Sequence, residues 1–419
     1  MAPGADPAPS RGDAQALVLI EEFGAQLGRM KGAGAKLVQF LSMLALEPER
    51  SRGALGGLRA SPGAVAFDRV RRVVERELDA PVRELFSDFD EEPLALASLG
   101  QVHRARTNDG ALVAVKVQHP GVAEAIEGDL RNLGLVGPLI RRLAPGVDAG
   151  AVLAEVRERI SDELDYELEA QHQRRLERRF RGHPHVLVAR VHTGLSTRRV
   201  LVTDYLEGLG TPAIERLPEA ERDRVGELVF RFYLGLAWRD GIVAGDPHAD
   251  NCVLCPDGRL GLLDFGLLRD LERDYVEAER GIMHAIATGD APGVHDGLVG
   301  LGYLPEPDAV EPDALLGHLA AAGAWLLEPG FRRLGPDDVD RVVALGYPPR
   351  SPWFAQMRRL SVPAPTLLLR RMELQVLSLL GDLRAGADWG ALAAEHHAGA
   401  TPSTALGRED HAFYARRAR

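Results

Sequence analysis

The hydrophobic positions follow a helical period over most of the chain and alternate with polar positions only in short stretches. Apolar residues three or four apart predict helices over residues 14–46, from Ser61-Pro62 to about residue 78, and over 122–144 and 150–180. Ser61-Pro62 is a typical helix start, because serine caps a helix and proline fits its first turn. From residue 207 onward the pattern is again mostly helical.

One hairpin is indicated before the middle of the chain. Residues 101–106 and 111–118 flank Asn108-Asp109-Gly110, a sequence that tolerates the positive φ angles of tight turns. Alternation in the second stretch places Val113, Val115 and Val117 on one face and Lys116 on the other. We therefore expect a strand pair with one buried face.

Further strands are expected before and after residue 205. A second strand pair is predicted over 186–191 and 198–204, and a short hairpin over 252–254 and 260–264. The pattern thus predicts helices first, then a strand-rich lobe with inserted helices, then a helical lobe that contains one hairpin. The expected division is a disordered leader over 1–13, a helical extension over 14–60, the strand-rich lobe over 61–204 and the helical lobe over 205–419.

The composition is that of a folded protein without an electrostatic nucleic-acid surface. The 419 residues are 45% hydrophobic and 26% charged, which allows a buried core, and the length predicts more than one lobe. A net charge of −11 and an aromatic content of 5% argue against a basic or base-stacking surface. The only two cysteines, Cys252 and Cys255, exclude a disulfide scaffold. Their strand spacing points them to opposite faces, so we expect a structural role rather than half of a zinc site.

No export or membrane-spanning segment is expected. The sequence lacks a charged start followed by an apolar run, and it lacks a stretch of about 20 apolar residues. The apolar run over 367–380 carries Arg370, Arg371 and Glu373, and it predicts an amphipathic helix that packs in the second lobe. A role at a membrane surface or in a dimer is the alternative. The expected location is cytoplasmic, with peripheral membrane contact left open.

Lysine is rare in this chain, which makes its positions informative. Of the 50 lysines and arginines only three are lysines, Lys31, Lys36 and Lys116. A lysine in the middle of a buried strand costs free energy unless its ammonium group has a partner. In a kinase-like lobe such a lysine reaches the phosphates of a nucleotide and pairs with a helix glutamate. A lysine at the edge of a strand is the alternative.

A second group of polar residues has the spacing of a phosphoryl-transfer site. Asp246 is followed five positions later by Asn251, and Asp264 precedes Phe265-Gly266 beyond the expected hairpin. In this arrangement the first aspartate orients or deprotonates the acceptor, while the asparagine and the second aspartate hold Mg²⁺, which prefers oxygen ligands. Loop caps and turn residues are the alternative.

Taken in order, these motifs resemble the UbiB/ADCK-type (AarF-like) atypical kinases of the protein-kinase-like superfamily over about residues 27–270. The other segments that carry the resemblance are Lys36-Leu37-Val38-Gln39, an alanine-rich stretch over 95–103, Glu163-Leu164-Asp165-Tyr166 with Glu169, and residues 199–208. The resemblance implies an α+β, bilobal protein-kinase-like fold with a small strand-rich N-terminal lobe, a helical C-terminal lobe and an N-terminal helical extension.

The resemblance also implies roles for residues. Lys116 would bind phosphates and pair with Glu169, Asp246 would be the catalytic aspartate, and Asn251 and Asp264 would hold Mg²⁺. Lys36 and Gln39 of the extension would lie over the active site, and Glu163 and Asp165 would help to position that extension. The residues that would contact the nucleotide, besides Lys116, are Ala97, Ser98, Gly100, Thr203 and Tyr205.

Three positions depart from the family pattern. Val38 stands where the signature has glycine, and Ala244 stands where the family often has histidine. Asp250 replaces a glycine of the catalytic loop, and it either changes the Mg²⁺ affinity or faces solvent. Because the core lysine and both core aspartates are present, the sequence does not indicate a pseudokinase.

These observations favour an ATP-dependent atypical kinase or ATPase that binds Mg·ATP between two lobes. The family's usual setting implies an isoprenoid lipid or quinone precursor as a partner, and no nucleic acid. The alternatives are a small-molecule phosphotransferase of the aminoglycoside or choline kinase type, and a nucleotide-gated scaffold without catalysis. The first alternative usually has a glycine-containing phosphate loop and lacks a segment like 36–39.

Overall fold

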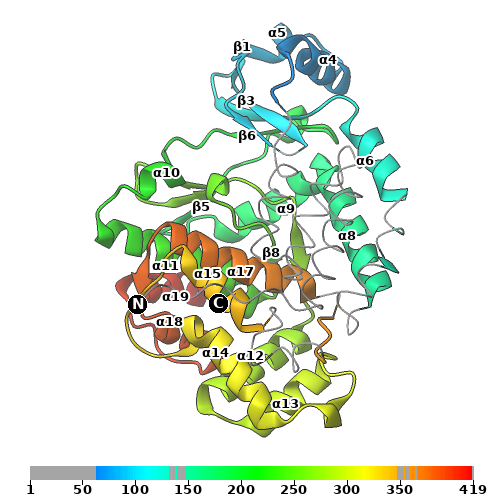
Figure 1. The fold of residues 1–419 in the computed structure, drawn as a ribbon. Helices are drawn as coiled ribbons and strands as arrows, with labels where there is room; N and C mark the ends of the chain where they lie inside the picture. The colour runs from blue at the N-terminus through cyan, green and yellow to red at the C-terminus, as the bar shows by residue number, and fades with distance from the viewer. Residues whose placement is uncertain are drawn as a thin grey trace, which may run out of the picture.

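The computed structural model describes residues 63–97, 99–131, 134, 137–138, 148–346, 353, 359–363 and 366–417. Within them a small lobe rich in strands lies at one end of a larger lobe made mostly of helices (Figure 1). The fold is therefore α+β and bilobal, as the sequence predicts. Lys36, Gln39 and Ser98 lie outside the described residues, as do the leader over 1–13 and the extension over 14–60.

The small lobe is built on an antiparallel sheet with the order β1–β3–β4–β6, and β2 also pairs with β3. Its strands are β1 (Phe86–Phe89), β2 (Ala95–Leu96), β3 (Gly100–Thr107), β4 (Leu112–Gln118) and β6 (Val200–Asp204). The β3–β4 hairpin is the one predicted from Asn108-Asp109-Gly110, and Gly110 has the positive φ of 89° that this turn requires. Val113, Val115 and Val117 are each 0% exposed, which confirms the predicted alternation.

Helices α4 (Phe67–Leu78) and α5 (Val82–Leu85) cover the valine face of this sheet. The prediction that the first of them starts at Ser61-Pro62 is wrong, because residues 63–66 are not helical. The side chain of Gln101 in β3 binds both backbone groups of Val65, accepting from its N–H at 2.8 Å and donating to its carbonyl at 3.2 Å. These bonds hold the chain extended just before the helix.

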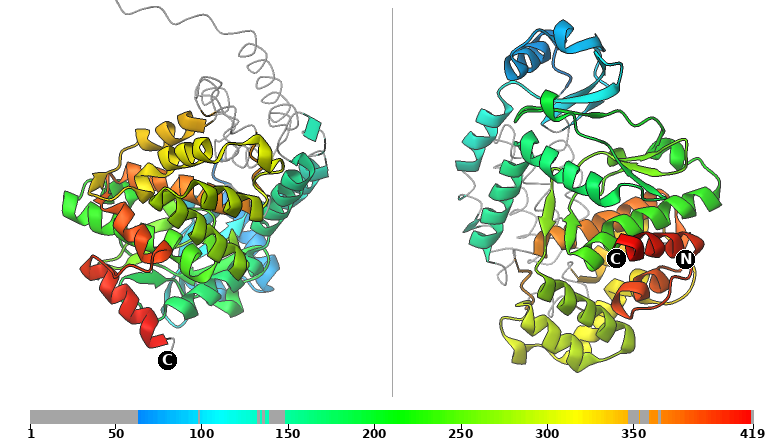
Figure 2. Two further views of the ribbon diagram at one scale, coloured as in Figure 1. Left: turned by 90° about the horizontal axis from the view of Figure 1, so that it is seen from below. Right: turned by 180° about the vertical axis from the view of Figure 1, so that it is seen from behind.

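In the described part of the chain, the helices α6 (Val122–Arg131), α8 (Ala149–Glu163) and α9 (Tyr166–Phe180) lie between strands β4 and β6 of this sheet. The first two lie along one side of the molecule (Figure 1 and Figure 2). The sequence predicts one continuous helix over 150–180, but the chain breaks between α8 and α9. The cause is Asp165, whose Oδ1 accepts hydrogen bonds from the backbone N–H groups of Glu167 and Leu168 and so caps a new helix.

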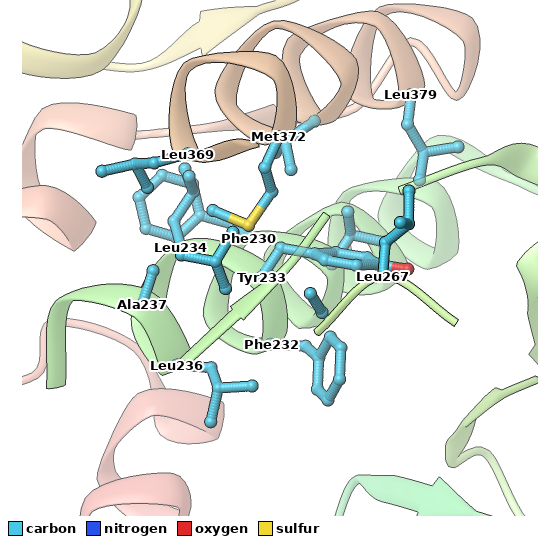
Figure 3. Close-up of a cluster of buried hydrophobic side chains, with 14 of the residues drawn as sticks. Phe230, Phe232, Tyr233, Leu234, Leu236, Ala237, Leu267, Leu369, Met372 and Leu379 are labelled. Carbon is cyan, nitrogen blue, oxygen red and sulfur yellow. The ribbon is translucent and has the colours of Figure 1, made fainter. Parts of the chain in front are cut away.

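The large lobe is organised around one buried helix. Its helices are α10 (Thr211–Ile214), α11 (Glu219–Asp240), α12 (Arg273–Thr288), α13 (Ala291–Gly300), α14 (Pro312–Leu327), α15 (Asp337–Gly346), α17 (Leu367–Asp382), α18 (Trp389–His397) and α19 (Ala405–Arg417). Every residue of α11 from Val225 to Trp238 is buried, so this helix has neighbours on all sides. Figure 3 shows Leu369 and Met372 of α17 packed over Phe230 and Leu234 of α11. The predicted amphipathic helix over 367–380 is thus a packing helix of this lobe.

Short strands complete the large lobe. They are β5 (Val186–Val188), β7 (Leu209–Gly210), β8 (Ile242–Ala244), β9 (Cys252–Leu254), β10 (Leu260–Leu262), β11 (Leu268–Asp270), β12 (Arg332–Arg333) and β13 (Gly386–Ala387). One sheet has the order β5–β10–β9–β7, and β8 pairs with β11 and β12 with β13. The predicted β9–β10 hairpin is confirmed, but the lobe contains more strands than that hairpin.

The expected pairing of 186–191 with 198–204 is wrong for most of its length. β5 pairs in parallel with β10, and β6 pairs with β4. Only an isolated bridge between Val191 and Thr203 joins the two segments. The physical reason is burial, since Val186 and Val188 belong to the main hydrophobic core of the large lobe and not to that of the small one.

Among the described residues, none of the helices combines the length and the apolar character that crossing a bilayer requires.

Candidate nucleotide and metal site

The centre of the candidate site is a buried lysine that touches two carboxylates. Lys116 Nζ of β4 donates to Glu169 of α9, at 2.8 Å from Oε1 and 2.9 Å from Oε2. It also lies 3.0 Å from Oδ2 of Asp264, which follows β10. The side chains of Lys116 and Glu169 are 18% and 3% exposed, whereas that of Asp264 is 31% exposed. The structure therefore brings together three predicted site residues that come from distant parts of the sequence.

Attraction between the ammonium group and the carboxylates of this cluster offsets the free-energy cost of burying their charges. Burial opposes the charged form of Lys116, but the carboxylates of Asp264 and Glu169 outweigh it and raise the pKa of Lys116 well above its usual value. Burial raises the pKa of Glu169, and the neighbouring Lys116 counteracts that effect. Because two carboxylates surround one ammonium group, the cluster has an excess of negative charge when both are ionised. Such a site favours an additional cation.

Helix α9 also holds the segment that follows Asp264. One turn beyond Glu169, His172 Nδ1 lies 3.1 Å from the carbonyl oxygen of Phe265, which can only accept, so Nδ1 carries the proton. Arg175 forms two hydrogen bonds with Asp270, of 2.8 and 2.6 Å. The sequence analysis did not identify His172 and Arg175. His172 lies three residues after Glu169 and Arg175 lies three residues after His172, and this spacing along one helix face is the signal that could have found them.

The alanine-rich stretch forms the tip of the β2–β3 hairpin. Ala97 N–H donates to the carbonyl of Gly100 at 2.9 Å and closes the tip. A Cβ atom on Gly100 would lie 2.3 Å from the backbone oxygen of Val117 and 2.8 Å from the hydroxyl of Tyr166. Glycine is therefore required here by close packing against β4. Gly100 is the first residue of β3, which pairs with the strand β4 that carries Lys116, and Ala97 lies in the connection just before it.

The predicted hinge lies where the chain leaves the small sheet. Thr203 pairs with Ala114 in the β6–β4 ladder, and Tyr205 N–H donates to the carbonyl of Leu112 at 3.0 Å. After Tyr205 the chain continues to β7 in the large lobe. Both residues are half-buried, so their backbone is positioned at the junction of the two lobes.

The predicted catalytic loop follows β8. Asn251 Nδ2 donates to the backbone carbonyl of Asp246 at 3.1 Å, and the carbonyl of Asn251 accepts from Leu263 N–H at 3.1 Å. These bonds link the Asp246 loop to the strand that leads to Asp264. Asp250 is exposed and contacts only the ring of His248 at 3.5 Å among the described residues, so it faces solvent.

The side chain of Asp246 is held by residues that the sequence analysis did not identify as functional. Arg371 Nη2 of α17 donates to Asp246 Oδ1 at 2.6 Å, and Gln375 Nε2 donates to the same oxygen at 3.2 Å. From the sequence, Arg371 is one of the charged residues of the amphipathic helix predicted over 367–380. No local signal identifies Asp246 as its partner, because 125 residues separate them.

The oxygen donors fit a magnesium site that is completed by phosphates. Within the described part of the chain, no group of three or more His, Cys, Asp or Glu residues could hold a metal ion. Mg²⁺ in phosphoryl-transfer sites is bound by one or two protein groups together with phosphate oxygens and water, so a complete protein cage is not needed. Asp264 is accessible enough to act as such a ligand, and the bond from Asn251 Nδ2 leaves its Oδ1 as a second oxygen donor.

The other predicted residues have structural contacts. Asp165 caps α9 and thereby fixes the helix that carries Glu169. Glu163 is the last residue of α8 and lies directly before this break. Cys252 and Cys255 are buried free thiols, and burial raises the pKa of Cys252 to about 12, which favours its neutral thiol form.

Comparisons with known proteins point to one family. The model of the ABC1 atypical kinase-like domain matches residues 58–297. The mitochondrial atypical kinase coq-8 of Caenorhabditis elegans is 32% identical over 289 residues, which cover 67% of this chain and 38% of that protein. The chloroplastic protein Activity of BC1 complex kinase 7 of Arabidopsis thaliana is 28% identical over 305 residues, which cover 72% of this chain and 43% of that protein. The chain thus spans less than half the length of these curated relatives.

A solved structure is similar over nearly the whole chain. It is the complex of Rv3197 with erythromycin from Mycobacterium tuberculosis, with 28% sequence identity and a TM-score of 0.67. The match covers 92% of this chain and 98% of that one.

Proposed function

Because the chain belongs to the ABC1 atypical kinase-like family, we propose that it binds Mg·ATP between its two lobes and acts as a kinase or ATPase. The observation that carries the proposal is the contact of Lys116 with Glu169 and Asp264. A buried ammonium group at the junction of two lobes, beside an accessible carboxylate, is suited to phosphates and a divalent cation.

Each residue of the cluster has a distinct part in this proposal. Lys116 contacts the phosphates and is kept in place by Glu169, while Asp264 and Asn251 would hold Mg²⁺. Bound there, the ion would neutralise charge that develops on the phosphate oxygens. Asp246 orients the acceptor hydroxyl or water and takes its proton. Family membership favours this function over an aminoglycoside or choline kinase-like activity.

The nucleotide's other contacts follow from the two segments beside the cluster. The adenine would meet the backbone near Thr203 and Tyr205, where β6 ends and the chain crosses to the large lobe. The phosphates would lie under the tip of the β2–β3 hairpin, beside Ala97 and Gly100, and Ser98 stays a predicted nucleotide contact. Asp165 also supports this arrangement through its cap on α9. The segment with Lys36 and Gln39 would lie over the site, and Glu163 and Asp165 would help to position it.

For the acceptor we propose an isoprenoid lipid or quinone precursor, reached by peripheral contact with a membrane. Family membership supports this class, and one curated relative is named atypical kinase coq-8. The solved relative Rv3197 is described in complex with the macrolide erythromycin. A ligand panel should therefore include both a polyprenyl phenol and a macrolide, with turnover of ATP and protein melting temperature as readouts.

The central experiment is a thermal-shift titration with Mg·ATP. Wild-type protein should be stabilised, and Asp264→Asn should lose most of that stabilisation because a charged metal ligand is removed. Asp274→Asn, at an exposed position of α12, is the matched control and should respond like wild type. An unchanged titration of Asp264→Asn would refute the assignment. Binding without any ATP turnover would favour the nucleotide-gated scaffold instead.

A further inference from the structure

Helix α17 supplies both hydrogen bonds that reach the Asp246 carboxylate in the described part of the chain. They come from Arg371 at 2.6 Å and Gln375 at 3.2 Å, and both end on Oδ1. The two donors lie one helical turn apart and thus on the same face of α17. The side chain of Arg371 is 2% exposed and that of Asp246 24%, so the carboxylate is held on one side and open on the other.

The close approach of α17 to the loop depends on the residue before Asp246. A Cβ atom on Gly245 would lie 2.3 Å from Cδ1 of Leu368. Any larger side chain would therefore push the start of α17 away from the loop. Glycine at this position lets the helix lie directly on the loop, so that Arg371 reaches Asp246 one turn later.

The rest of α17 packs against the large lobe, so the helix should stay in place if the Asp246 side chain moves. Leu369, Met372 and Leu379 pack into the core around α11 (Figure 3). On another face of the helix Arg370 forms ion pairs with Glu279 of α12 at 2.6 Å and with Glu373 at 2.8 Å. The apolar packing of α17 against α11 therefore keeps Arg371 and Gln375 in fixed positions beside Asp246.

From these contacts we infer that Arg371 and Gln375 are positioning residues for Asp246, an inference that rests on the proposed function. They fix the rotamer of the carboxylate through Oδ1 and present Oδ2 to the proton of the acceptor hydroxyl or water. α17 lies outside residues 58–297, the part that matches the family model, so the orienting contacts come from a different part of the chain from Lys116, Asp246 and Asp264.

A positioning role has a specific kinetic signature. The hydrogen bonds of Lys116 go to Glu169 and Asp264, whereas the Asp246 carboxylate is bonded by Arg371 and Gln375, so loosening it should leave the nucleotide in place. The rate of phosphoryl transfer should fall, because a misplaced general base no longer reaches the proton. We therefore expect a change in kcat with little change in KM for ATP.

The experiment measures steady-state ATP turnover by the full chain and by three single variants of α17. Arg371→Gln and Gln375→Leu should lower kcat by about tenfold and about threefold, with KM for ATP within about twofold of wild type. Arg371→Lys keeps a cationic donor and should recover part of the loss. Gln375→Leu removes a neutral group, so it tests the inference even if Arg371→Gln does not fold.

Arg370→Gln is the matched control, because Arg370 lies on the same helix and bonds carboxylates that do not include Asp246. It should lower the melting temperature and leave kcat within about twofold of wild type. If Arg370→Gln lowers kcat as much as Arg371→Gln, the effect belongs to the helix as a whole and the inference is wrong.

A double-variant cycle separates this inference from the proposed function. In an Asp246→Asn background Arg371→Gln should cause no further loss in single-turnover rate, because both substitutions disable the same group. Full additivity would overturn the positioning role. If Asp246→Asn itself leaves turnover unchanged, the catalytic role of Asp246 fails as well. If Asp246→Asn abolishes turnover and both α17 variants keep the wild-type kcat, only the positioning role fails.

Discussion

Lys116 Nζ lies within 3.0 Å of Glu169 and of Asp264, although these carboxylates are 53 and 148 residues away in the sequence. The contact joins the central strand of the small sheet, helix α9 and the segment after β10. Burying two charges costs free energy, and the cost is recovered only when each charge keeps a close partner. The cluster therefore depends on all three elements being in place at once.

Replacement of Glu169 tests this dependence. Glu169→Gln leaves Lys116 with Asp264 alone, so the lysine should turn toward the metal ligand and away from the phosphates. We expect a loss of about 2 kcal/mol in unfolding free energy and about tenfold weaker binding of Mg·ATP. Chemical denaturation and nucleotide titration measure the two effects. Glu167→Gln, on the exposed side of the same helix, is the control, and equal affinities in both variants would contradict the role given to Glu169.

A second prediction concerns Gly100, where a Cβ atom would come 2.3 Å from a backbone oxygen. Backbone cannot move aside as a flexible side chain can, so Gly100→Ala should separate β3 from β4 and cost about 2 kcal/mol or more. Gly281→Ala is the control, and it should change the free energy of unfolding in the opposite direction. Gly281 is an exposed helix position with open space around it, and alanine there should stabilise the helix by up to about 1 kcal/mol. A normal melting temperature for Gly100→Ala would contradict the packing.

The hairpin tip offers a third prediction. Ala97 N–H is already bonded to the carbonyl of Gly100, so this amide does not point freely at a phosphate. Ala97→Gly should loosen the tip and change the relative affinities for ATP and ADP, with a loss of fold stability of about 1 kcal/mol. Paired ATP and ADP titrations measure the change, with the melting temperature as control. Unchanged affinities for both nucleotides in a normally folded variant would show that the tip does not touch the phosphates.

Local patterns predicted the parts of the fold that local forces determine. The β3–β4 hairpin could be read because alternation and the turn at Asn108-Asp109-Gly110 act within 20 residues. The start of α4 could not, because the bond between Gln101 and Val65 that keeps the preceding residues extended crosses 36 positions. The break between α8 and α9 at Asp165 was only partly predictable. Its capping residue is visible in the sequence, but the helical period runs through it.

The residues of the candidate site also fall into those that the sequence indicates and those that it does not. Lys116, Asp246 and Asp264 could be chosen because their residue types and spacing are unusual in strands and loops. Arg371 could not be chosen from the sequence, because an arginine on an amphipathic helix is ordinary. Its partner Asp246 is determined by the way α17 packs on α11. Sequence patterns identify groups that carry the chemistry more readily than groups that only position them.

The last prediction uses the pH dependence of the buried charges beside α17. Glu373 bonds Arg370 at 2.8 Å, and Arg370 also bonds Glu279, so two carboxylates share one guanidinium group. Burial raises the pKa of Glu373 to about 7, and the charge of Glu279 adds to the effect while Arg370 opposes it. Between an ordinary glutamate pKa near 4.5 and this value, the folded protein holds a proton that the unfolded chain has lost.

Unfolding free energy should therefore fall as the pH rises from about 4.5 to about 7, by up to about 3 kcal/mol from this group. Glu373→Gln imitates the protonated form and should remove this part of the slope. The variant should match wild type near pH 4.5 and be more stable than wild type at pH 8. Glu277→Gln, at an exposed position of α12, is the control for loss of one charge. Because other groups titrate in the same range, the measured quantity is the difference between variant and wild type in denaturant unfolding at each pH. A constant difference across the range would mean that Glu373 is ionised in the folded protein throughout, and that Arg370 holds both carboxylates in their charged form.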